Sequence, residues 1–198
     1  MNQLNEISGF GQTDPTDGRK KLEWESKYSD PKAQHGIRCE AIYLAVLLFV
    51  VPAIMVILWL ELPKNWFHLS DSKYKAIYKF GLAWASGTLG GTLFDIKWLY
   101  HSVARQLWHI DRRLWRVFTP HISGCLAFGV TAIIASGAMK IFESKATDSY
   151  TMLVGLGFLV GYFSDSAIAK LYELAETIFG TSLSKERHKR IMEEHKDS

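Results

Sequence analysis

The chain has 198 residues, a formal net charge of +3 and a mean hydropathy of +0.01. The length fits a single domain, and so small a charge does not favour nucleic acid as a partner. The hydropathy lies near zero only because very apolar stretches alternate with charged ones. Seven Trp, eight Tyr and eleven Phe make the chain rich in aromatic residues, which are typical of proteins that meet the headgroup layer of a membrane.

The most apolar stretch runs from Ala41 to Leu60 and contains no charged residue. Glu40 and Glu61 lie directly on either side of it. As a helix, these twenty residues would extend about 30 Å, which is the hydrocarbon thickness of a bilayer. A buried helix of a water-soluble protein is seldom apolar on every face over such a length. This stretch therefore predicts a membrane-spanning helix.

Three further stretches predict spans, at residues 76–94, 117–139 and 149–169. The first of them carries a single charge, on Lys79, and the second carries none. The apolar part of the last, residues 149–164, would extend only about 24 Å as a helix, so this span must continue past Asp165. A re-entrant hairpin is the alternative for this segment. The predicted fold is an all-α membrane protein with four transmembrane helices.

Lysine and arginine residues are shared unevenly among the segments outside these spans. Four lie in residues 21–40, five lie between the second and third spans, and six follow the fourth, whereas the other two connections hold three and two. Positive residues concentrate on the cytoplasmic side of membrane proteins. We therefore expect both termini and the middle loop to be cytoplasmic. Residues 1–40 would form a polar, partly disordered tail, residues 41–180 the membrane domain, and residues 181–198 a charged tail.

The middle loop carries aliphatic residues at steps of three and four from Ile96 to Val117, which predict an amphipathic cytoplasmic helix. Tryptophans and arginines border this apolar stripe: Trp98, Arg105, Trp108, Arg112, Arg113 and Trp115. Such a helix either lies flat on the membrane or projects from it as paired helices. Two interpretations stay open, because this surface could bind anionic lipid headgroups of the bilayer or a cytoplasmic protein partner. A similar stripe from Ala167 to Phe179 predicts a cytoplasmic C-terminal helix.

Small residues recur at every fourth position in three of the spans. They are Ala83, Gly87 and Gly91 in the second span, Ser123, Ala127, Thr131 and Ala135 in the third, and Gly157 and Gly161 in the fourth. This spacing puts them on one helical face, where two backbones can approach closely. We expect these faces to pack helices within the chain, and the spare faces of four small helices to support a homo-oligomer.

Four polar residues are expected to meet at the cytoplasmic boundary of the membrane: Asp95, Arg116, His121 and Asp165. Asp165 is central to this prediction, since the fourth span must continue beyond it. An acid at the edge of the hydrocarbon is costly unless it is paired, so we expect an arginine or His121 beside it. The simpler interpretation is an ion pair that fixes helix register. The alternative is a switch that responds to protons, ions or lipid.

The sequence carries none of the common catalytic signatures, such as HExxH, a Walker loop, CxxC or GxSxG. The glycines of residues 155–161 do not follow a predicted strand and lack the dinucleotide-binding spacing. We therefore predict no enzyme activity, no cofactor and no metal site.

The run GFLVGYFSDSAIAKLYELAETIFG, together with GTLGGTLFD ahead of it, resembles a pattern in uncharacterised small bacterial four-span inner-membrane proteins. In those proteins a glycine-rich span precedes a basic, Trp-containing loop, and two further spans end in an aromatic-acid boundary. The resemblance covers about residues 81–180. It implies a bacterial inner membrane and brings no activity with it.

Two functional hypotheses follow from these patterns. The first is a non-enzymatic, oligomeric scaffold or sensor subunit, which presents the basic, Trp-rich loop to a partner or to anionic lipid. The second is a small channel or transporter, in which Asp95, His121 and Asp165 would line a path between protomers.

Overall fold

The computed structural model describes residues 26, 28–137 and 149–179, and over this part the chain is entirely helical. The helices are, in chain order, α1 (Pro31–Trp59), α2 (Leu62–Trp66), α3 (Asp71–Ala104), the 3-10 turn η2 (Ile110–Arg112), α4 (Arg113–Ala135), α5 (Tyr150–Tyr162) and α6 (Ser164–Phe179). The prediction of an all-α protein is confirmed. Most of the predicted N-terminal tail, the end of the third predicted span and the charged C-terminal tail lie outside the described residues.

Helix α1 begins at a well-formed cap and contains the first predicted span. The side chain of Asp30 accepts a hydrogen bond of 2.9 Å from the backbone N–H of Lys32, and Pro31 supplies the first helical residue. The turn after α1 is tied together by Lys64, which contacts Asp71 at 2.8 Å and Glu61 at 3.2 Å. The hydrogen bond from Lys64 lowers the pKa of the Asp71 carboxyl.

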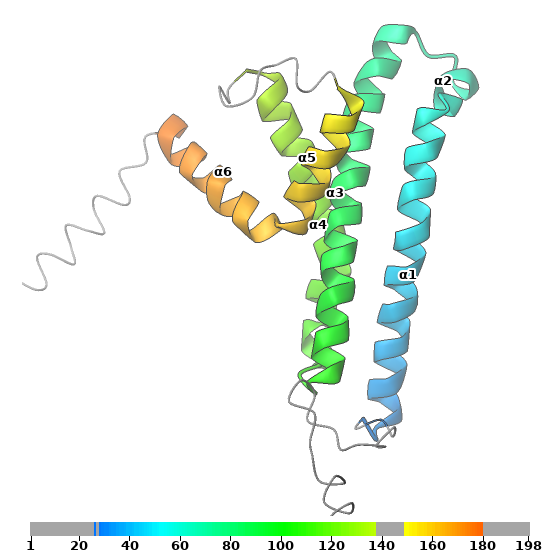
Figure 1. The fold of residues 1–198 in the computed structure, drawn as a ribbon, viewed down its shortest axis with the longest axis vertical. Coiled ribbons are helices and arrows are strands. Elements are labelled where there is room, and N and C mark those ends of the chain that lie inside the picture. The colour runs from blue at the N-terminus through cyan, green and yellow to red at the C-terminus, as the bar shows by residue number, and fades with distance from the viewer. Residues whose placement is uncertain (1–25, 27, 138–148, 180–198) are drawn as a thin grey trace, which may run out of the picture.

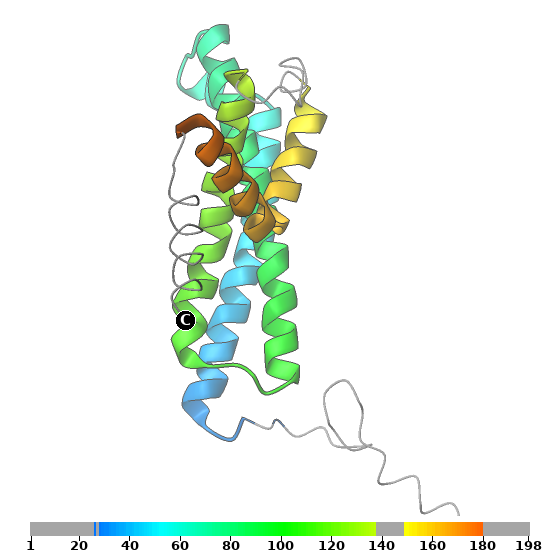
Figure 2. The same ribbon diagram turned by 90° about the vertical axis from the view of Figure 1, so that its left-hand side faces the viewer.

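Helix α3 is the central element of the bundle. Its 34 residues extend about 51 Å at helical rise, and it packs against α1, α4 and α5. The two views show α1 and α3 side by side along the length of the molecule, with α5 covering only the upper part of α3 (Figures 1 and 2). Every other long helix therefore takes its position from α3.

The interior of the bundle combines apolar clusters with many small polar residues, whereas its outside carries large apolar side chains. Buried positions on α3 and α4 hold Ser86, Thr88, Thr92, Ser123 and Thr131. Large apolar side chains stand exposed on the outer faces of α1, α4 and α5: Ile42, Val46, Phe49, Val56, Phe118, Ile122, Phe128 and Leu159. A water-soluble protein seldom exposes so continuous an apolar surface, and close-packed small residues are typical of helix contacts in a bilayer.

Two helical stretches are each long and apolar enough to cross a membrane, α1 and residues Ile110–Ala135. Helices α5 and α6 satisfy the same test only as a pair, so the described part offers two spans, or three if the pair counts as one. Helix α3, which contains the predicted span 76–94, is not among them. Its stripe of Gly, Ser and Thr lowers its hydropathy, because these residues face other helices and need not be apolar.

The predicted fourth span over residues 149–169 is not one helix. The chain breaks at Phe163, and the pair α5–α6 is bent by 98°, so the prediction of a straight continuation past Asp165 was wrong. A new helix begins here, with Ser164 as its first residue and Asp165 in its first turn, and both residue types are favourable at a helix N-terminus.

The prediction of a separate amphipathic loop helix over residues 96–117 was also wrong. Helix α3 continues to Ala104, the chain turns at Gln106 with a positive φ of 59°, and α4 begins at Arg113. The apolar stripe is thus divided between two paired helices, which is the other arrangement that such a pattern allows. The turn is capped by the N–H of Leu107, which donates to the carbonyl of Ser102 at 2.8 Å.

Candidate functional site

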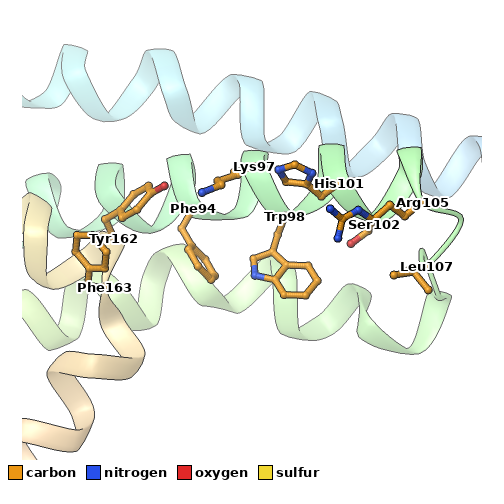
Figure 3. Close-up of a pocket in the computed structure, with 9 residues that line it drawn as sticks. All are labelled: Phe94, Lys97, Trp98, His101, Ser102, Arg105, Leu107, Tyr162 and Phe163. Atoms are coloured by element: carbon orange, nitrogen blue, oxygen red, sulfur yellow. The ribbon is translucent and has the colours of Figure 1, made fainter. Parts of the chain in front are cut away.

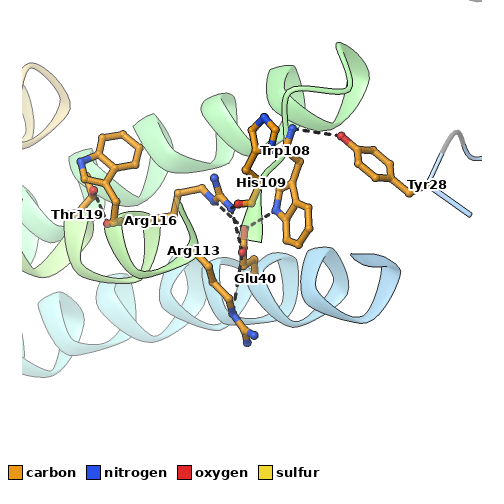
Figure 4. A network of polar contacts seen from close by, with 8 residues as sticks. Tyr28, Glu40, Trp108, His109, Arg113, Arg116 and Thr119 are labelled. Atoms are coloured by element: carbon orange, nitrogen blue, oxygen red, sulfur yellow. Dashed lines mark hydrogen bonds and ion pairs between the residues drawn. The ribbon is translucent and has the colours of Figure 1, made fainter. Parts of the chain in front are cut away.

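The start of α1, the end of α3, η2 and the start of α4 meet at one end of the bundle, here called the basic end. Its centre is a buried ion pair between α1 and α4 (Figure 4). Arg116 donates to Glu40 through Nε at 2.7 Å and through Nη2 at 3.1 Å. Both residues are at most 3% exposed. A bidentate, charge-assisted pair of this kind fixes the two helices in one register.

Trp108 completes the coordination of this carboxylate. Its indole Nε1 donates to Glu40 Oε2 at 3.1 Å, and the guanidinium of Arg116 lies 5.7 Å from its ring centroid. The indole also approaches α1 so closely that a Cβ on Gly36 would lie 2.9 Å from it. Arg116 Nη2 also donates to the carbonyl of His109 at 3.2 Å. The loop between α3 and α4 is therefore held rigidly against α1.

The segment before α1 is attached to the same loop. The backbone N–H of Trp108 donates to the Tyr28 hydroxyl at 3.2 Å, and that hydroxyl donates to the carbonyl of Ser102 at 3.4 Å. The Tyr28 ring meets the Trp108 ring edge-on at 6.2 Å between centroids. Residues before α1, the end of α3 and the loop thus form one connected unit (Figure 4).

Asp95 differs from the other buried charged residues described at this end, because its carboxylate has no hydrogen-bond partner. It is completely buried, and neither of its carboxylate oxygens has a hydrogen bond among the described residues. Arg116 and Glu40 are close enough to act on it electrostatically. Nearby, the Tyr43 hydroxyl donates to the carbonyl of Val117 and contacts His121 Nε2, both at 2.9 Å.

Replacing Asp95 by asparagine is expected to leave the free energy of unfolding unchanged or to raise it slightly. The carboxylate has no hydrogen bond to lose among the described residues, and a neutral side chain of the same shape avoids the cost of burying a charge. Unfolding in SDS followed by tryptophan fluorescence measures this. A loss above about 2 kcal/mol, the scale of a broken buried hydrogen bond to a charged group, would show that Asp95 has a partner after all.

A groove opens on α3 where α5 ends (Figure 3). It has a volume of about 410 Å³. Its aromatic lining comes from α3 and from the α5–α6 junction, namely Phe94, Trp98, Tyr162 and Phe163. Its basic lining comes from successive turns of α3, namely Lys97, His101 and Arg105. The edge of the Phe94 ring meets the Tyr162 ring at 6.1 Å between centroids, so the upper boundary of the groove is closed by aromatic packing.

A second exposed surface lies on η2 and the first turn of α4. We call it the tip surface and define it by four exposed residues, Ile110, Arg112, Leu114 and Trp115. Leu114 is 70% exposed, and Arg112 has no acidic partner among the described residues. The tip surface is thus apolar and cationic at the same time, on a loop that the Glu40 network makes rigid.

The predicted boundary cluster is only partly assembled. Arg116 and Asp95 are neighbours, and His121 lies across from Tyr43. The expectation that Asp165 is paired with an arginine or with His121 was wrong, because it is exposed on α6 and has no hydrogen bond or ion pair among the described residues. The bend of 98° at Phe163 carries it away from the bundle, onto the exposed first turn of α6.

The predicted partner surface is likewise divided. Trp98 and Arg105 line the groove, and Arg112 and Trp115 belong to the tip surface. Arg113 is half-buried and its Nε lies 4.0 Å from Glu40. Trp108 does not belong to any surface, because it is 6% exposed and binds Glu40; its placement on a partner surface was wrong.

The predicted small residues lie where helices come closest. A Cβ added to Gly87 would meet Ala127 and Ser123 of α4, and one added to Gly91 would meet Ser123. Gly157 abuts Ser86 and Ala83, and Gly161 abuts the backbone of Gly87. These contacts are all within the chain. The expected homo-oligomer is not tested by them.

Three residues of this end were not singled out from the sequence as functional. Glu40 was taken only as the charged boundary of the first span, and its position on the same α1 face as Gly36 and Leu44 was the available signal. Lys97 and His101 share one face of α3 with Arg105 at steps of four, which a helix extending past Asp95 would have revealed.

Among residues 26, 28–137 and 149–176, no three His, Cys, Asp or Glu side chains come together as metal ligands would. No protein-family model, curated protein or solved structure matches this chain.

Proposed function

We propose that this protein is a non-enzymatic membrane scaffold or sensor subunit, which presents the tip surface to a protein partner in the cytoplasm. The observation that carries the proposal is that a rigid loop exposes large apolar side chains and a cation that has no acidic partner among the described residues. The buried Glu40–Arg116 pair and Trp108 hold the loop, while Arg112 and Leu114 stay exposed on it. Arg and large apolar side chains on a preorganised element are typical centres of protein interfaces.

The membrane placement of this proposal is supported by two features. The large apolar side chains stand on the outer faces of α1 and α4, and the apolar run of α1 begins directly after Glu40. The level of Glu40, Asp95 and Arg116 would then mark one edge of the hydrocarbon. With the basic end cytoplasmic, α1, α3 and α4 would cross the membrane. Helix α5, which extends only about 20 Å, would enter from the opposite side and turn at Phe163 into α6, which runs back toward the α2 end of the bundle, as in the re-entrant alternative (Figure 1).

A homo-oligomer is part of the proposal. Helix α1 buries only a narrow stripe against its neighbours, composed of Gly36, Glu40, Leu44, Val51 and Leu58. Past Glu40, large apolar side chains stand exposed on the outer face of α1, among them Ile42, Val46 and Phe49, so this face can meet either lipid or a second copy of the chain.

The test is purification of tagged protein in mild detergent, with native mass determination of what is retained. The expected result is a stoichiometric cytoplasmic protein that is lost when Arg112 becomes glutamate and kept when Lys73, an exposed residue at the opposite end of α3, becomes glutamate. Trp108 and Arg113 are unsuitable for this test because both contact Glu40. Retention of the partner in Arg112→Glu, or a homo-oligomer with no partner, would contradict the proposal.

The second candidate function is a small channel or transporter, and the unpartnered Asp95 favours it. A completely buried carboxylate without a hydrogen bond among the described residues is the kind of group that ion and proton pathways use. Purified protein in liposomes would then carry a cation or proton flux that disappears in Asp95→Asn. Equal background leakage from both proteins would exclude this function.

A further inference from the structure

The face of α3 that receives α5 changes its chemistry where α5 ends. Along the upper part of this face the residues are small, with Ala83, Ser86, Gly87 and Gly90 in contact with α5. The same face then continues as Phe94, Lys97, Trp98, His101 and Arg105. Because α5 turns away at Phe163, it does not cover this continuation, and the groove of about 410 Å³ lies there (Figure 3). Trp115 of α4 borders the groove, with its ring edge-on to the rings of Phe94 and Trp98.

The groove crosses the proposed edge of the hydrocarbon. Asp95 lies at the level of Glu40 and Arg116, so Phe94 and the Tyr162–Phe163 junction are on the bilayer side of it. Along the helix, Lys97, His101 and Arg105 lie about 3, 9 and 15 Å beyond Asp95. The headgroup layer is about 5–7 Å thick on each side of a bilayer. The aromatic part therefore adjoins acyl chains, Lys97 lies within the headgroup layer and His101 lies near its outer edge. Arg105 lies about 8–10 Å beyond this layer, so its long side chain must reach back toward the phosphate.

The cations of the groove are available to a ligand. Lys97 and Arg105 are exposed and make no ion pair among the described residues. The His101 side chain makes no hydrogen bond or ion pair among the described residues, and its ring lies 5.2 Å from that of the neighbouring Tyr100 between centroids. Two cations and an imidazole on one helical face, beside an aromatic wall, match an anion that carries an apolar chain.

We propose that this groove binds one anionic phospholipid, with its phosphate at Lys97, His101 and Arg105 and an acyl chain along Phe94, Tyr162 and Phe163. The bound lipid would cover the part of the α3 face that lies beyond the end of α5, and so complete the packing of the bundle. This inference rests on the membrane placement proposed above, but not on the protein partner of the tip surface.

The test is native mass spectrometry of delipidated protein, titrated with dioleoylphosphatidylglycerol or with dioleoylphosphatidylcholine. We expect one tightly bound phosphatidylglycerol per chain and weaker phosphatidylcholine binding. Each cation near an anionic lipid contributes about fivefold in affinity, so Lys97→Gln with Arg105→Gln should weaken phosphatidylglycerol binding about thirtyfold. The matched control, Lys73→Gln with Lys75→Gln at the other end of α3, should leave it unchanged.

Several outcomes would overturn the inference. One is equal binding of the two lipids, and another is equal loss in the groove and control variants, which would indicate general charge attraction only. Glycerol 1-phosphate that competes as well as the whole lipid would indicate a site for soluble anions. Failure of the membrane placement is recognised separately, because the protein would then be released from membranes by alkaline carbonate. Arg112→Glu should keep the lipid, so that loss of a partner and loss of lipid are independent results.

Discussion

Glu40→Gln is expected to destabilise the protein by about 3–5 kcal/mol, the cost of removing one member of a buried ion pair. Arg116 is 3% exposed, so its charge cannot reach water once the carboxylate is gone. Glutamine keeps the shape of glutamate but presents a single acceptor oxygen, whereas Glu40 now receives Arg116 Nε, Arg116 Nη2 and Trp108 Nε1. Unfolding in SDS, followed by the fluorescence of Trp108 and the other tryptophans, measures the loss.

The double variant Glu40→Leu with Arg116→Leu is the informative control. Removing both charges eliminates the uncompensated ion, and replacing a buried pair by apolar residues is often neutral. The double variant should therefore regain most of the stability that Glu40→Gln loses. The free energy of unfolding of Glu40→Gln could instead lie within about 0.5 kcal/mol of that of the parent protein, the range of ordinary surface substitutions. In that case the network does not hold the basic end together.

Gly161→Ala is expected to separate α5 from α3 and to cost about 1–3 kcal/mol or more, as overpacking does in a close-packed interior. A Cβ on residue 161 would lie 2.0 Å from the carbonyl oxygen of Gly87. That atom belongs to the backbone of the central helix, so it cannot rotate aside as a side chain would. The same SDS titration measures the free energy of unfolding of this variant.

Gly155→Ala provides the matched control on the same helix. It lies six residues before Gly161, and a Cβ there would meet nothing within 4 Å. Alanine is the better helix former by about 1 kcal/mol, so this variant should be neutral or more stable. If Gly161→Ala lowers the free energy of unfolding and Gly155→Ala raises it, α5 packs closely on α3 within one chain. Equal losses would indicate that Gly155 faces another copy or that α5 packs elsewhere.

Much of the fold follows from sequence patterns because membrane helices show their period and length directly. The apolar run after Glu40 predicts α1, and the spacing of Gly157 and Gly161 predicts a close helix contact, which the structure places against α3. Helix α3 itself is harder to recognise by hydropathy, since its buried face is made of Gly, Ser and Thr. Its small-residue spacing is the better signal.

The candidate site could be predicted only in part, because its key contacts join residues far apart in the chain. Glu40 and Arg116 are 76 positions apart, and no local pattern pairs them. The stripe from Ile96 to Val117 fitted one helix as well as two, since both α3 and α4 bury aliphatic residues. Asp165 was misjudged because residues 149–169 were expected to form one helix, whereas the chain breaks at Phe163 and α6 begins at Ser164.

The central claim is that the bundle crosses the membrane with its basic end in the cytoplasm, and cysteine accessibility tests it most directly. Cys39 and Cys125 would first be replaced by serine, and a single cysteine introduced at Asn65 in α2 or at Arg112 in η2, both exposed positions at opposite ends. In intact bacterial spheroplasts, a membrane-impermeant maleimide should label Asn65→Cys at once and Arg112→Cys only after permeabilisation. Labelling of both without permeabilisation, or of Arg112→Cys alone, would contradict the account.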